Sequence, residues 1–301
     1  MTPVSQGKPC AGNPHARFDE GASAPEEPRR KALLHEDATF NDEFKKCRFR
    51  YDALKEQVAN GIEMYAHLVD TEGPNIETQY MMLVGQFECQ AKRLDLEVRR
   101  WKRRLALRQE YLNRGEKPDP VAIEAQLDKE LAEWQDKIDS LLARVKDSRL
   151  LWDTEKLSSE ETSEIRCAYL KAVKKLHPDV NPDLPEAAVR LWNQIQQAKA
   201  EKDWRKLKFL VSLVDEVTAG QDVFDETPEG LEKLRAACAR LEEKEHEVSR
   251  QIAELKAHEP FSYLVLLEDE DLLKERRDEL KARIAKLEEV IEKYERMWNN
   301  G

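Results

Sequence analysis

The sequence predicts an all-α protein in which a compact helical hairpin is flanked by long antiparallel coiled-coil hairpins. Charged residues make up 37% of the chain. So high a charged fraction favours helices with solvated surfaces that bury their apolar residues in narrow seams between them. Glycine accounts for only 10 of the 301 residues, so the tight turns that sheets need are scarce. Apolar residues recur at steps of three and four over much of the chain, which is the spacing of amphipathic helices.

The N-terminal part of the chain divides into a tail and a helical region. Residues 1–38 are expected to form a disordered tail, because the first 30 residues hold five prolines and three glycines without a periodic apolar pattern. Residues 39–157 form the expected helical and coiled-coil region. Its first helix is predicted from about Phe40 to Val69, with a stop near the polar stretch Asp70–Pro74.

A pair of apolar seams follows within this region. One seam runs from Val84 to Leu112 and the next from Leu127 to Val145, with turn-forming residues between them. A short turn between two such seams predicts an antiparallel helical hairpin over about residues 75–157.

Residues 226–299 also contain two apolar seams with a break between them and are expected to form a C-terminal antiparallel coiled-coil hairpin. Its seams run from Leu231 to Leu255 and from Leu273 to Trp298. Pro260 ends the first of these helices. The apolar run 261–267 is predicted either to pack across the tip of the hairpin or to dock on another helix, since it is too short to span a bilayer.

Residues 158–217 differ from the seams on both sides, with shorter helices and a Pro-Asp loop. Ser158 and Glu161 have the spacing of a capping box at a helix start. The apolar arc of this helix consists of Ile165, Ala168, Tyr169, Ala172, Val173 and Leu176. The opposite face carries Arg166, Lys171, Lys174 and Lys175. We expect these four bases to point into solvent, away from the apolar arc.

The helix is predicted to end at His177-Pro178-Asp179, because proline disfavours helical geometry in the residue before it. The loop continues through Val180 and Asn181. A second helix then places Ala188, Leu191, Trp192, Ile195 and Ala198 on one stripe. The segment is therefore predicted to be two antiparallel helices joined by a His-Pro-Asp loop.

These residues resemble the J domains of DnaJ-type (heat-shock 40) co-chaperones. The family pattern E-I-(K/R)-x-A-Y-x-K-x-x-x-K-x-H-P-D-x-N is matched without a gap from Glu164 to Asn181, and its F-x-x-I-x-x-A spacing by Trp192, Ile195 and Ala198. The chain holds neither a Gly/Phe-rich linker nor CxxCxGxG repeats, and so is similar to the J-domain-only class with coiled-coil flanks.

The match to the family has departures. Leu176 stands where an aromatic residue is common, Val180 where a lysine is common, and Lys199 where a tyrosine is usual. These departures are compatible with weak stimulation of a partner.

The resemblance implies that this segment docks on a DnaK-type (heat-shock 70) chaperone in its ATP state and accelerates ATP hydrolysis there. The implied chaperone-binding residues are His177, Pro178, Asp179, Asn181, Arg166, Lys171, Lys174 and Lys175. A basic helix face suits an acidic patch, and the Asp179 carboxylate suits a bidentate pair with an arginine. The coiled-coil arms are expected to select a client or a location. The alternative function is a structural coiled-coil scaffold with a non-functional J-like segment.

Other functions are not favoured by the sequence. No Gly-rich phosphate loop, nucleophile motif or metal-ligand spacing is present, so we expect neither an enzyme nor a cofactor or metal. The five cysteines are widely spaced, and no secretory signal or membrane span is found, which predicts a cytoplasmic protein. Nucleic-acid binding by the basic cluster around Trp101 is not expected, because acids on the next helix can offset its charge.

Overall fold

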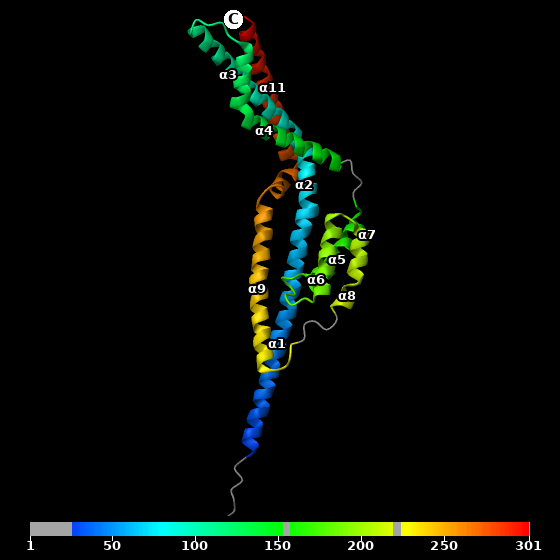
Figure 1. Cartoon of the computed structure of the whole chain (residues 1–301). Helices are drawn as coiled ribbons and strands as arrows, with labels where there is room; N and C mark the ends of the chain where they lie inside the picture. The colour runs from blue at the N-terminus through cyan, green and yellow to red at the C-terminus, as the bar shows by residue number, and fades with distance from the viewer. Residues whose placement is uncertain (1–25, 153–156, 219–223, 301) are drawn as a thin grey trace, which may run out of the picture.

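The computed structural model describes residues 26–152, 157–218 and 224–300. Every element within these ranges is helical, as the predicted all-α class requires. The helices form two arms (Figure 1): a lower arm in which α1 and α9 run side by side, and an upper arm built from α3, α4 and α11. No helix in these ranges is long and apolar enough to cross a membrane.

One continuous helical run extends through both arms. It comprises α1 (Glu26–His67), the π-helical turn η1 (Leu68–Glu72), α2 (Gly73–Tyr80), the π-helical turn η2 (Met81–Gly85) and α3 (Gln86–Asn113). The residues at the junctions keep right-handed helical backbone angles. Residues 26–38 therefore belong to α1 and not to the expected tail, whose residues 1–25 lie outside the described ranges.

The predicted helix stop at Asp70–Pro74 is wrong, because a π-helical turn carries the chain through it. The N–H of Gly73 donates to the carbonyl of Leu68, five residues earlier. Pro74, which has no N–H to donate, occupies the first turn of α2 directly after the π-helical turn. Leu68 is also buried in a cluster with Phe261 from the far end of the chain. This tertiary packing favours continuation over the local stop signal.

The upper arm is a three-helix bundle. The chain turns at Gly115, whose φ of +72° lies in the left-handed region that glycine favours. Helix α4 (Pro120–Trp152) then packs back along α3, and α11 (Glu270–Asn299) packs along α3 as well. Leu107 and Leu127 are buried together near the turn.

The expected C-terminal hairpin over residues 226–299 does not form. Helix α9 (Pro228–Ala257) packs along α1, whereas α11 packs along α3, so their apolar seams close on the long helical run and not on each other. Helix α9 approaches α1 closely at Gly61, where an added Cβ would lie 2.8 Å from Cγ1 of Val248. The seam pattern defines an apolar stripe but not its partner, which is why the pairing was mispredicted.

The apolar run 261–267 docks on another helix, the second of the two predicted alternatives. It folds into the 3₁₀ turn η3 (Phe261–Tyr263) and the short helix α10 (Leu264–Leu267). The ring of Tyr263 stacks on that of Tyr80 in α2, with 3.8 Å between centroids. This contact connects the lower and upper arms at the point where α9 ends.

The segment with the His-Pro-Asp loop is a small group of helices beside α1 (Figure 1). It comprises α5 (Ser159–Leu176), α6 (Glu186–Ala200), α7 (Trp204–Ser212) and α8 (Val214–Val217). Its buried residues join those of α1 and α9 in one apolar cluster, which includes Val58, Ile195 and Leu241. The segment therefore shares its core with the lower arm.

Candidate functional site

Helix α5 and helix α6 form the framework of the candidate site. The predicted capping box is present, since the hydroxyl of Ser158 accepts from the N–H of Glu161 and the Glu161 carboxylate accepts from the N–H of Ser158. The apolar faces of the two helices meet at Tyr169 and Trp192, whose ring centroids lie 6.0 Å apart. Both rings are buried. The loop between the helices is therefore held at both ends by packed helices.

The His-Pro-Asp loop is fixed by its own hydrogen bonds. His177 leaves the helix with extended backbone angles, and its ring packs edge-on against Trp192 at 5.1 Å between centroids. The N–H of Asp179 donates to Nδ1 of His177 over 3.1 Å. The side-chain amide of Asn181 donates to the carbonyl of Lys174 over 3.0 Å, which ties the loop back to α5.

These contacts determine the chemical state of His177. Because Nδ1 accepts a hydrogen bond, the ring is neutral with its proton on Nε2. Burial lowers the pKa of His177 from its usual value of 6.5, the carboxylate of Asp179 opposes this shift, and the ammonium of Lys244 reinforces it. His177 is thus an oriented, neutral side chain that supports the loop.

The four bases of α5 are not free, contrary to the predicted solvated face. Arg166 donates two hydrogen bonds to Glu63 of α1, at 2.8 and 3.0 Å. Lys174 donates to Glu56 of α1 over 2.6 Å. The prediction failed because α1 lies directly beside this helix, which no local pattern in α5 indicates.

The other two bases of this face turn toward α8. Lys171 and Lys175 both donate to Asp215, over 2.6 and 2.7 Å. These two hydrogen bonds lower the pKa of Asp215 to about 2. Both lysines keep nearly half of their side-chain surface exposed. This part of the basic face is therefore still accessible from outside.

The loop contacts the rest of the chain, and so do the residues that depart from the family pattern. The carboxylate of Asp179 pairs with Lys244 of α9 over 3.1 Å. Val180 is fully buried in the shared apolar cluster. Lys199 pairs with Asp70 over 2.7 Å, and its ammonium lies 4.0 Å from the ring centroid of Tyr169. Within the His-Pro-Asp tripeptide, Pro178 at the apex is exposed, whereas His177 and Asp179 are half-buried.

Sequence reasoning missed the residues that meet this site from outside. They are Glu56, Glu63, Asp70 and Lys244. The three acids are spaced seven residues apart, which places them on one stripe of a helix. This acidic heptad stripe was the available signal. Recognising it required a helix that continues past Asp70, which the predicted stop excluded.

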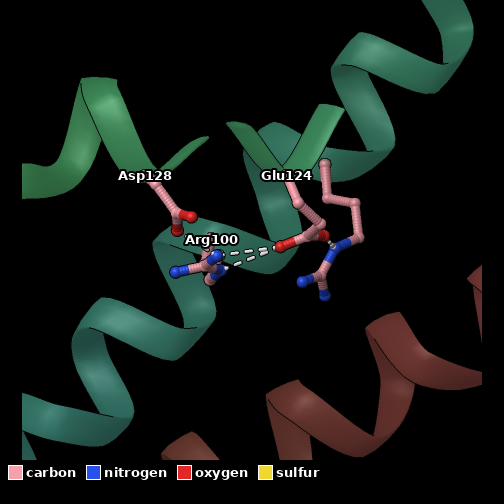
Figure 2. Close-up of polar contacts among 4 residues, drawn as sticks. Arg100, Glu124 and Asp128 are labelled. Atoms are coloured by element: carbon pink, nitrogen blue, oxygen red, sulfur yellow. Dashed lines mark hydrogen bonds and ion pairs between the residues drawn. The ribbon is translucent and has the colours of Figure 1, made fainter. Parts of the chain in front are cut away.

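The basic cluster around Trp101 is paired within the upper arm. Figure 2 shows Arg100 of α3 facing Glu124 and Asp128 of α4. Nη2 of Arg100 donates to the carboxylate of Glu124 over 2.8 Å. Arg104 donates to the same Glu124 over 2.6 Å. The hydrogen bond to Arg104 is the main cause that lowers the pKa of Glu124. These arginines connect helices rather than forming a free cationic surface.

Comparison with known protein families, curated proteins and solved structures finds no match to this chain. The resemblance to J domains therefore rests on the residues between Glu164 and Ala198. Among the described residues, no group of three or more histidine, cysteine or acidic side chains is placed to hold a metal ion.

Proposed function

We propose that the chain is a J-domain-type co-chaperone that docks on a DnaK-type (heat-shock 70) chaperone and stimulates its ATP hydrolysis. The observation that carries this proposal is the preorganised His-Pro-Asp loop at the end of a basic helix. His177 is seated on Trp192, and Asp179 is anchored through its own N–H. A hairpin that served only to connect two helices would not need this arrangement.

The proposed mechanism uses binding energy alone. The bases of α5 attract an acidic surface of the chaperone, with a strength that falls as salt rises. The Asp179 carboxylate accepts two hydrogen bonds from an arginine of the partner. Since the loop is already ordered, little entropy is lost on docking. Preferential binding to the hydrolysis-competent state of the chaperone then raises the population of that state.

The same proposal assigns the upper arm to recognition. Helices α3, α4 and α11 carry none of the loop residues, and the tip of the upper arm that they form lies at the end away from the J-like segment (Figure 1). We assign to them the selection of a client protein or a cellular location, with the chain working in the cytoplasm.

A structural scaffold is the second candidate, and one observation favours it. Arg166, Lys174 and Asp179 already have partners of opposite charge within the chain. In a scaffold, these residues would only join α5 and its loop to α1 and α9.

The test is single-turnover ATP hydrolysis by a DnaK-type chaperone from the same source. The chain is expected to accelerate hydrolysis, and His177→Gln and Asp179→Asn are expected to remove the effect while the helical circular dichroism stays unchanged. Asp183→Asn is the matched control, because it removes an exposed carboxylate from the same loop region. Both the parent chain and Lys244→Glu, which breaks the ion pair between Lys244 and Asp179, are tested at up to tens of times the chaperone concentration. If neither protein accelerates hydrolysis, the scaffold function replaces the co-chaperone function.

A further inference from the structure

The lower arm carries charged groups that face α5 and its loop. They have the signs that a docking partner would need in order to bind the same residues. Helix α1 and the adjoining turn η1 present the acidic heptad stripe Glu56, Glu63 and Asp70 to three bases of the J-like segment. The pairs are Glu56 with Lys174, Glu63 with Arg166, and Asp70 with Lys199. Helix α9 offers the base Lys244 to the acid Asp179. All four of these ion pairs therefore join the lower arm to the J-like segment.

This contact is partly desolvated. The side chain of Glu63 is only 8% exposed, and the apolar cluster beneath it runs from α1 and α9 into α5 and α6 without interruption. Val180, next to Asp179, is fully buried in that cluster. A partner that binds Arg166, Lys174 and Asp179 together has to displace Glu63, Glu56 and Lys244, because these groups already pair with the three side chains.

We propose that α1 and α9 form an autoinhibitory cap over the chaperone-docking face. The α1–α9 cap consists of the part of α1 and η1 that carries Glu56, Glu63 and Asp70, together with the part of α9 that carries Lys244. It pairs with Arg166, Lys174 and Asp179 but not with Lys171 and Lys175, which bind Asp215 within the J-like segment and serve the first encounter. The proposal rests on the co-chaperone function proposed above, whose docking face it describes.

The energetics follow from competition between the cap and the chaperone for one surface. Docking requires the open state, so the apparent dissociation constant equals the intrinsic constant divided by the open fraction. Lys244 and Asp179 are 28% and 40% exposed. A partly exposed ion pair of this kind changes such an equilibrium about two- to fivefold when it is removed. Loosening the cap should therefore lower the concentration of chain needed for stimulation.

The experiment compares two variants on one helix. Lys244→Glu replaces the attraction to Asp179 by repulsion, whereas Lys233→Glu makes the same charge change at an exposed position nearer the start of α9. Lys244→Glu is expected to lower the half-maximal concentration about two- to fivefold or more, and Lys233→Glu to leave it unchanged. Glu56→Lys repels Lys174 from α1 and is expected to act in the same direction. His177→Gln added to Lys244→Glu should abolish stimulation.

A second measurement tests the proposed cap independently of the proposed co-chaperone function. Amide hydrogen exchange over residues 174–181 reports opening directly, and it is expected to accelerate in Lys244→Glu but not in Lys233→Glu. If the chain stimulates hydrolysis in a His177-dependent way but Lys244→Glu changes neither the half-maximal concentration nor exchange, the cap is overturned and the function stands. If exchange accelerates but no variant stimulates hydrolysis, the proposed function is overturned, and with it the inhibitory role of the cap.

Discussion

The ion pair between Arg166 and Glu63 should contribute more to stability than any other charge contact of α5. Both nitrogens Nε and Nη2 of Arg166 donate to the carboxylate, at 2.8 and 3.0 Å. The Glu63 side chain is 8% exposed and that of Arg166 is 38% exposed. Arg166→Met retains most of the apolar stem of the arginine and removes only the guanidinium. It therefore leaves a buried carboxylate without its partner.

The expected magnitude follows from this burial. Removing one partner of a fully buried ion pair costs about 3–5 kcal/mol. The exposed part of Arg166 admits water, so we reduce this range to about 2–3 kcal/mol. Arg166→Met/Glu63→Leu removes both charges and is expected to recover most of the loss, because a buried carboxylate is replaced by an apolar side chain of similar size.

The measurement is urea unfolding followed by circular dichroism at 222 nm, with the two single variants, the double variant and the parent chain forming a double-mutant cycle. Arg166→Met should lower the midpoint without changing the slope. A loss below about 0.5 kcal/mol, with no coupling between the two positions, is what an exposed ion pair would give. That result would refute the reasoning that α1 is closed onto α5.

Two further predictions concern the loop. Trp192→Ala truncates a buried ring that contacts both Tyr169 and His177, so it should cost about 3–5 kcal/mol in urea unfolding and accelerate amide exchange in the loop. The second concerns pH. Burial lowers the pKa of His177 in the folded chain, so the unfolded chain binds this proton at higher pH. The resulting stability is present above about pH 6.5 and is lost as pH falls through the lower folded-state pKa. The melting temperature should therefore fall more steeply below pH 6.5 in the parent chain than in His177→Gln, and equal slopes would contradict this.

The features that the sequence predicted correctly are local ones. The start of α5 depends on hydrogen bonds between Ser158 and Glu161, and its end depends on the geometry that Pro178 imposes on His177. The all-α class follows from apolar spacing, which is also local. Each of these signals lies within a few residues, so no knowledge of the rest of the chain was needed.

The features that were mispredicted depend on contacts between distant segments. The helix continues through Pro74 because Leu68, just before it, packs against Phe261 nearly two hundred residues later. Likewise, α9 could pair with either of two helices by its seam alone. Its choice of α1 depends on close approach at Gly61 and on the length of the helical run, neither of which a seam encodes.

The residues that depart from the family pattern can be explained by their contacts with the rest of the chain. A J-like segment without function would be free to lose any part of its loop, yet His177, Pro178 and Asp179 are all present. The changed positions are Leu176, Val180 and Lys199. Leu176 and Val180 are buried in the cluster shared with α1 and α9, and Lys199 pairs with Asp70 of η1. A lysine at position 180 would place a charge in an apolar core, and a tyrosine at position 199 would leave Asp70 without its base. These substitutions are therefore what a docking segment would need in order to fit beneath its own cap.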